Sequence, residues 1–324
     1  MDPSEYRKRY QEELERADEE TPAFRELLER SRSLDATGPS MPSAAGQRSE
    51  DEVAESIQIL LDQSADPQSR ATALEAISLE VAKRHDLIDV VLGLLRDPSE
   101  PRLLRWTALN ILRASSFRAA MFAPKRPDFL DTLRSIIDDP DLKLREQALE
   151  VLAQEKDEYA QRRLLEGLEN PASALVPPEK ALQFLGYDIH AEHYALLRDL
   201  VRKPPNPIAK LEAVRLLASD ASSKDLLTEV LLDRGEDPEI RSASAAALQS
   251  LAPAEFEELA QQIVLDDNED DRLRAAAMSA LDHFGESGST TGKSEFLERI
   301  KQLQNITSGE LKRAANRFVT RRQE

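Results

Sequence analysis

Apolar residues recur three or four positions apart in a series of short runs that together occupy most of the chain. Examples are DLIDVVLGLLR at residues 86–96, SKDLLTEVLLD at 223–233 and EFEELAQQIVLD at 255–266. This spacing predicts amphipathic α-helices, each with one apolar face. A pair of such helices cannot bury both of its apolar stripes alone, so consecutive pairs are expected to stack on one another.

A second pattern runs in step with these helices and begins at a basic residue, which we call the anchor. A small residue lies three positions after each anchor and an aliphatic residue seven positions after it, so both lie on one helical face. The anchors are Arg70, Arg105, Arg145, Lys210, Arg241 and Arg274. The small residues are Ala73, Ala108, Ala148, Ala213, Ser244 and Ala277, and the aliphatic residues are Ile77, Leu112, Leu152, Leu217, Leu248 and Leu281. The small residues are expected to let a neighbouring helix approach closely.

Asx-Pro pairs precede the anchors at regular intervals. They begin at Asp66, Asp97, Asp139, Asn170, Asn206 and Asp237, with separations of 31, 42, 31, 36 and 31 residues. An Asx side chain accepts hydrogen bonds from the free N–H groups that open a helix, and proline fits in the first turn. Each pair therefore predicts the start of a helix or a helical turn. The commonest spacing leaves room for two helices of about 12 residues with their turns.

The chain is therefore predicted to be all-α, an α-solenoid of about seven stacked helical hairpins, with the second helices lining its inner face. The Asp-Pro, anchor, Ala and Leu pattern resembles HEAT repeats, in the short form of the bilin-lyase-like group, over residues 49–303. In that family the Asp and Arg of successive repeats form a ladder along the stack. The resemblance implies a ladder here through Asp66, Asp97, Asp139 and Asp237 with Arg70, Arg105, Arg145 and Arg241.

The fourth unit departs from this pattern. Pro178 stands where an anchor is expected, while Ala181 and Leu185 keep the register. The two prolines at 177 and 178 are expected to delay the helix and to remove one member of the ladder. A local kink in the stack is one interpretation, and a hinge or binding notch is the other.

Four regions are predicted from changes in composition along the chain. Residues 1–34 form charged N-terminal helices, residues 35–50 are a flexible linker rich in Gly, Pro, Ser and Ala, residues 51–306 are the solenoid, and residues 307–324 are a C-terminal capping helix. Thr307 and Glu310 form a capping box at the start of that last helix. The N-terminal helices are expected to cap the first repeat, to occupy the inner groove, or to bind a partner across the linker.

The charge of the chain narrows the classes of partner. The 324 residues carry a formal net charge of -18, from 61 acidic and 43 basic residues. Nucleic acids and membrane surfaces are anionic, so neither is a predicted partner. The sequence has no cysteine, which removes disulfides and thiolate metal sites and is compatible with a reducing compartment. Because no targeting or membrane-spanning segment is evident, the expected location is the cytoplasm.

No residue pattern indicates a catalytic centre, a cofactor site or a metal site. His190 and His193 offer two ligands, whereas zinc sites take three or four protein ligands, so both are interpreted as surface histidines. HEAT-like hydroxylases with a di-iron centre use His-Glu dipeptides, and this sequence contains none. A small-molecule substrate is not favoured.

Two sets of residues are predicted to bind a protein partner with a basic segment. The 42-residue spacing inserts SSFRAAMFAPKRPDF at residues 115–129, and Phe117, Met121, Phe122, Lys125 and Arg126 lie in this inserted loop. The alternative for the apolar members is that they fold back over an edge of the core. The second set is an acidic row on the predicted inner helices, formed by Glu229, Asp233, Glu255, Glu258 and Asp266.

These observations favour a non-enzymatic interaction scaffold whose surface is acidic toward its C-terminal half. The alternative comes from the resemblance alone and is a bilin lyase-like or chaperone subunit that acts on a phycobiliprotein. The acidity also has an explanation that involves no partner, which is a salty habitat or a GC-rich genome.

Overall fold

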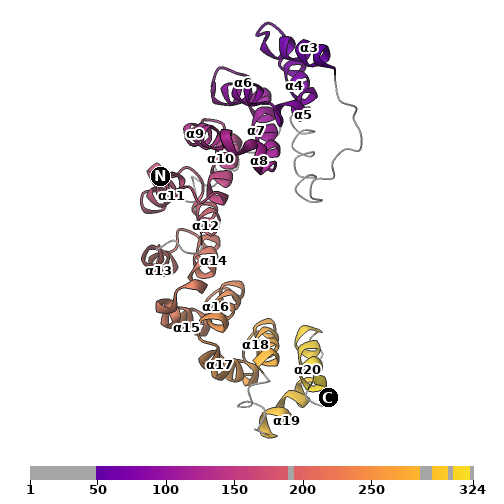
Figure 1. The fold of residues 1–324 in the computed structure, drawn as a ribbon. Coiled ribbons are helices and arrows are strands. Elements are labelled where there is room, and N and C mark those ends of the chain that lie inside the picture. The colour runs from indigo at the N-terminus through magenta and orange to yellow at the C-terminus, as the bar shows by residue number, and fades with distance from the viewer. Residues whose placement is uncertain (1–48, 189–192, 285–293, 306–308, 322–324) are drawn as a thin grey trace. The chain divides into compact units, whose positions relative to one another are not determined.

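The computed structural model describes residues 49–188, 193–284, 294–305 and 309–321. These residues divide into two compact units, one ending at Pro177 and the other beginning at Pro178. Both units consist of helices joined by short turns, with no strand among the described residues (Figure 1). The predicted N-terminal helices, and all but the last two residues of the predicted linker, lie outside the described residues.

The first unit begins with α3 (Glu50–Leu61) and ends with the turn η2. Its elements are α3, α4 (Pro67–Ala76), α5 (Ser78–Val81), α6 (His85–Arg96), α7 (Arg102–Ser116), α8 (Ala119–Phe122), η1 (Ala123–Lys125), α9 (Arg126–Ser135), α10 (Leu142–Gln154), α11 (Glu158–Glu169) and η2 (Pro171–Ser173).

The second unit begins with α12 (Pro178–Leu185) and ends with α20 (Gly309–Arg321). Between them lie α13 (Tyr194–Arg202), α14 (Pro207–Leu216), η3 (Leu217–Ser219), η4 (Ala221–Ser223), α15 (Lys224–Leu232), α16 (Pro238–Leu251), α17 (Pro253–Leu265), α18 (Asp271–Phe284) and α19 (Ser294–Leu303). None of the helices within the described ranges is long and apolar enough to span a bilayer.

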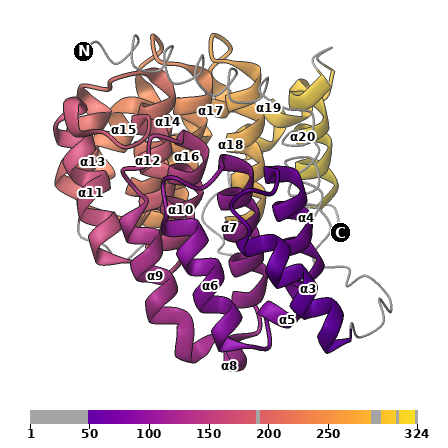
Figure 2. The same cartoon turned by 90° about the horizontal axis from the view of Figure 1, so that it is seen from above.

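Each helix that carries an anchor pairs with the amphipathic helix before it. We call the first kind anchor helices and the second kind flanking helices. The hairpins among the described residues are α3/α4, α6/α7, α9/α10, α13/α14, α15/α16, α17/α18 and α19/α20. The sequence analysis paired each anchor helix with the amphipathic helix after it, and this pairing was wrong by one helix. The predicted all-α stack of hairpins is confirmed. Figure 2 shows these helices from the side.

The face that follows each anchor is buried, as the spacing predicted. All six small residues and all six aliphatic residues are buried, the least buried being Ala73 with 6% of its surface exposed. Successive anchor helices pack on one another through this face, α4 on α7 in the first unit and α14 on α16 in the second. The small side chains permit this close approach, and the aliphatic side chains form the core behind them.

The Asx-Pro pairs open helices at only some of the predicted places. Asp66, Asn206 and Asp237 are N-caps whose side chains accept backbone N–H groups of the following helix, and Asn170 caps the turn η2. Asp97 ends α6 and opens a hydrogen-bonded turn, not a helix. The prediction was wrong at Asp139, because α10 is capped by Asp141 instead. At both places the next helix begins several residues after the Asx, beyond the reach of its short side chain. The side chain instead accepts a backbone N–H group of the intervening turn.

The fourth unit shows the predicted delay of its helix. The pair Asn170-Pro171 forms only the short turn η2, and α12 begins at Pro178. Gly167 permits η2 to lie against α11, because a Cβ atom at that position would be 2.9 Å from the Cα atom of Ala174. The division between the two units falls at this same proline pair.

The C-terminal helix buries the face that its sequence predicted. Leu311, Ala314, Ala315, Phe318 and Val319 are all buried in α20. Helix α20 packs on α18, and the ring of Phe318 meets that of Phe296 edge to face, with centroids 6.1 Å apart. Thr307 of the expected capping box lies outside the described residues.

Candidate functional site: an acidic groove between two flanking helices

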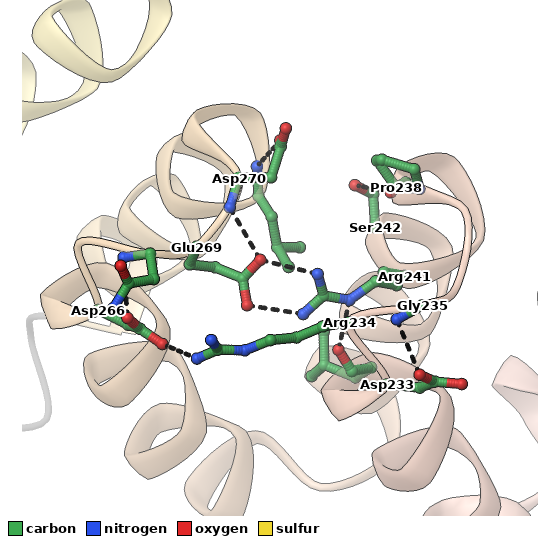
Figure 3. A network of polar contacts seen from close by, with 12 residues as sticks. Asp233, Arg234, Gly235, Pro238, Arg241, Ser242, Asp266, Glu269 and Asp270 are labelled. Carbon is green, nitrogen blue, oxygen red and sulfur yellow. Dashed lines mark hydrogen bonds and ion pairs between the residues drawn. The ribbon is translucent and has the colours of Figure 1, made fainter.

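An anchor arginine joins its own helix to the helix before it and to the turn before the next anchor helix, as Arg241 shows. Arg241 donates from Nε to the carbonyl oxygen of Leu231, at 2.8 Å, at the end of α15. Its two terminal nitrogens each donate to Glu269, at 2.7 Å, in the turn before α18 (Figure 3). The side chains of Arg241 and Glu269 are 5% and 7% exposed. The guanidinium lowers the pKa of the Glu269 carboxyl through these hydrogen bonds.

The same arrangement repeats at other anchors. Arg70 donates to the Leu60 carbonyl and to Glu100, and Arg105 donates to the Leu95 carbonyl and to Asp139. Each carbonyl is one of those left unpaired at the end of a helix, so the anchor satisfies it. At the fourth anchor, Lys210 forms an ion pair with Glu236.

The ladder implied by the family resemblance was therefore wrong in most of its acids. Of the predicted members only Asp139 bonds an anchor, because Asp66 and Asp237 point into their own helix N-termini and Asp97 closes a turn with Ser99. The acid that pairs is the one placed five or six residues before the next anchor, where it faces the preceding repeat. Arg145 has no such acid, and its buried Nε has no hydrogen-bond partner among the described residues.

The ladder pairs are structural. A candidate binding surface lies elsewhere, between α15 and α17. Within the second unit the anchor helices α14, α16 and α18, and after them α20, pack closely in succession. Helices α13, α15 and α17 lie on the other side of the stack and spread apart (Figure 1). The expectation that the second helices line the inner face is therefore not met in this unit. The spreading leaves a groove of about 470 Å³ between α15 and α17.

The floor of the groove is apolar and its walls are acidic. Leu248 and Ala252 at the end of α16, with Phe256 and Leu259 of α17, form the apolar lining. The acidic lining consists of Asp225 and Glu229 from α15 and of Glu255 and Glu258 from α17. Three of the five predicted acidic residues are thus brought together at one site.

One lysine partly balances this charge. Lys224 bonds both oxygens of Glu255, at 2.7 and 3.0 Å, and the hydrogen bond raises the pKa of the ammonium group. Within the described part of the chain, the exposed carboxylates of Asp225, Glu229 and Glu258 have no ion-pair partner. The groove therefore has a net negative field facing solvent.

The other two predicted acidic residues belong to turns. Asp233 follows α15 and accepts the Gly235 backbone N–H at 2.9 Å, and Asp266 follows α17 and pairs with Arg234 (Figure 3). Both carboxylates are engaged locally, and neither lines the groove.

The inserted segment is a set of short helical turns, and it divides the predicted apolar residues. Phe117 and Met121 are 84% and 44% exposed, but Phe122 is 2% exposed. The Phe122 ring packs edge to face on Phe129, with centroids 5.6 Å apart. Phe122 is therefore a core residue, as the alternative interpretation held, while Phe117 and Met121 face solvent.

The two cations of the insertion are already paired within the first unit. Lys125 bonds Asp89 at 2.5 Å and approaches Asp128, and Arg126 pairs with Glu155. These pairs connect η1 and the start of α9 to α6 and to the end of α10, so they hold the insertion in place.

Sequence reasoning missed two exposed leucines beside the groove. Leu232 and Leu265 are the last residues of α15 and α17 and are 50% and 40% exposed. The signal was present, because Leu232 falls outside the buried stripe formed by Leu226, Leu227, Val230 and Leu231.

No metal site emerges from the described residues, where no group of three or more His, Asp and Glu side chains is arranged to hold an ion. His193 lines a small cavity of about 70 Å³ with Tyr194 and Arg215. His190 lies outside the described residues.

Comparison with known proteins gives no family assignment. No family model matches the sequence, and no curated protein matches it. Human deoxyhypusine hydroxylase is a similar solved structure, with 14% identity, 76% of this chain and 98% of that chain covered, and a TM-score of 0.34. The complex of CpcE and CpcF of phycocyanin lyase from Nostoc sp. PCC7120 is another, with 18% identity, 88% and 99% covered, and a TM-score of 0.26. These values carry no argument about activity.

The fold itself defines the class. The chain is an all-helical repeat protein, built from stacked hairpins. Four of its six anchors, Arg70, Arg105, Arg241 and Arg274, are buried. Its clearest open surface is the acidic groove between α15 and α17.

Proposed function

We propose that this chain is a non-enzymatic, cytoplasmic interaction scaffold made of short HEAT repeats, and that its acidic groove holds a basic segment of a partner protein. The observation that carries the proposal is the set of exposed, unpaired carboxylates of Asp225, Glu229 and Glu258 around an apolar floor. Lysine and arginine side chains suit such a site, since their stems cover apolar surface while their charged ends meet carboxylates.

The exposed pair Phe117 and Met121 is proposed as a second contact, in the first unit. An aromatic ring and a thioether that are both exposed in one short inserted segment are typical of residues that become buried in an interface. The ion pairs of Lys125 and Arg126 hold this segment in position, which lowers the entropy lost on binding.

The test is charge reversal in the groove, E229K/E258K, against the matched control E55K/E75K. The control changes the same charge at exposed carboxylates of α3 and α4. Immobilised full-length protein is used to capture partners at low and high salt, and each captured protein is then purified and titrated by calorimetry. We expect the groove variant to weaken binding about tenfold or more at low salt and to flatten its salt dependence.

The control is expected to bind as the wild-type protein does. Partners that bind the groove variant with unchanged affinity and unchanged salt dependence would remove the groove from the proposal. Loss of binding in F117S/M121S alone would place the contact in the first unit.

A further inference from the structure

Two exposed leucines lie at the C-terminal ends of the two helices that form the groove. Leu232 and Leu265 each lie nine residues before an anchor, Arg241 and Arg274, so they occupy equivalent positions in consecutive repeats. They are 50% and 40% exposed in helices whose other large apolar residues are mostly buried. The exposed parts of these two side chains do not contribute to the packing of the second unit.

Neither leucine lines the groove itself, but each continues the helical face that carries the groove carboxylates. On α15, Asp225, Glu229 and Leu232 are spaced by four and three residues, which is one face of a helix. On α17, Glu255, Glu258, Gln262 and Leu265 share a face in the same way. The rise of a helix places Leu232 about 10 Å beyond Asp225 along the axis. The carboxylates that line the groove therefore lie toward the N-terminal ends of its two helices, and an exposed leucine lies at each C-terminal end. The aspartates that follow these leucines, Asp233 and Asp266, are engaged in a turn and in an ion pair.

We infer that the occupant of the groove is an amphipathic helix with two separate parts, a cluster of Lys and Arg and, about two turns away, a cluster of Leu-like side chains. The inference rests on the proposed function and specifies its partner. A purely basic segment would leave the two leucines in water. A purely apolar segment would cover the carboxylates of Asp225, Glu229 and Glu258 without a counter-charge, which is costly.

A helical occupant fits the geometry of this surface. The groove lining follows α15 from Lys224 to Glu229 and α17 from Glu255 to Gln262, so the space between the two helices is elongated in the direction of their axes. A helix laid in that space advances at the same rise per residue as its walls. Two turns of the occupant therefore match the separation between the acidic end and the leucines.

The experiment measures two synthetic peptides of about 14 residues against the full chain by fluorescence anisotropy. The first carries a block of Lys and Arg followed by leucines about two turns further on, and the second has serine in place of the leucines. The protein variants are L232S/L265S and E229K/E258K. L61S/L79S is the matched control, because Leu61 and Leu79 are 53% and 42% exposed in the first unit.

We expect L232S/L265S to weaken the leucine peptide about tenfold and to leave the serine peptide unchanged. High salt should abolish binding of the serine peptide and leave a residual affinity for the leucine peptide that depends on Leu232 and Leu265. The control L61S/L79S should bind both peptides normally.

Two negative outcomes separate the inference from the proposed function. If the two peptides bind equally and L232S/L265S changes neither, the partner is simply basic, and the two-part helix is refuted while the scaffold proposal stands. If E229K/E258K binds both peptides as tightly as the wild-type protein, the groove is not the binding site and both ideas fail.

Discussion

Removal of the Arg241 guanidinium tests whether the ladder holds the repeats together. We consider R241M, which keeps an unbranched chain but loses every donor. The substitution breaks the bidentate pair with Glu269 and the bond to the Leu231 carbonyl. It leaves a carboxylate that is 7% exposed without its counter-charge. Breaking a buried ion pair from one side costs about 3–5 kcal/mol, and that is the expected loss of unfolding free energy.

The double variant R241M/E269L separates the ion pair from the packing. Replacing both partners by apolar side chains removes the unpaired charge, so we expect the double variant to recover to within about 2 kcal/mol of wild type. R215M is the control, because Arg215 is 49% exposed and its ion pairs are expected to contribute less than about 1 kcal/mol.

The assay combines urea unfolding with hydrogen exchange read by mass spectrometry. In repeat proteins the stability of each repeat depends mainly on its neighbours. Protection from hydrogen exchange should therefore fall most in α15–α18 and least in α3–α7. A loss below about 1 kcal/mol for R241M, or a double variant as unstable as R241M, would refute the buried-ladder reasoning.

Three further predictions concern single residues. F122A should lower the unfolding free energy by about 3–5 kcal/mol, because the ring is buried, whereas F117A should change it by less than about 0.5 kcal/mol, as denaturant titration would show. S244A should stabilise the protein by about 1 kcal/mol in the same titration, because the buried Ser244 hydroxyl has no hydrogen-bond partner. Wild type should be more stable than E269Q at neutral pH. That difference should shrink as pH falls below 4.5, the ordinary pKa of Glu269, since its folded-state pKa is lower; an unchanged difference down to about pH 3 would contradict it.

Helix content and the buried anchor face could be predicted from the sequence because both depend on local spacing. The residues three and seven positions after each anchor follow one helical face, and all of them are buried. Pairing could not be predicted in the same way. A helix such as α16 has short connections on both sides, so the sequence does not tell whether α15 or α17 packs on it more extensively.

The candidate site was predicted only in part, for a similar physical reason. The acidic row could be predicted from the sequence. Which of its members line the groove depends on how far apart the flanking helices lie: Glu229 and Glu258 do, and Asp233 and Asp266 do not. Phe122 and Phe117 are both aromatic residues of one insertion, and only the packing on Phe129 distinguishes the buried ring from the exposed one.

The ladder pairs also bear on how such a chain tolerates changes of length. Lys210 and Glu236 are 26 residues apart, Arg241 and Glu269 are 28, Arg70 and Glu100 are 30, and Arg105 and Asp139 are 34. The contact is the same although the number of intervening residues differs, because the added residues of the longest interval form α8 and η1 outside the ladder. Evolution or protein engineering can therefore lengthen the segment from Phe117 to Lys125, by a short motif or a whole inserted module, without shifting the register of the repeats on either side.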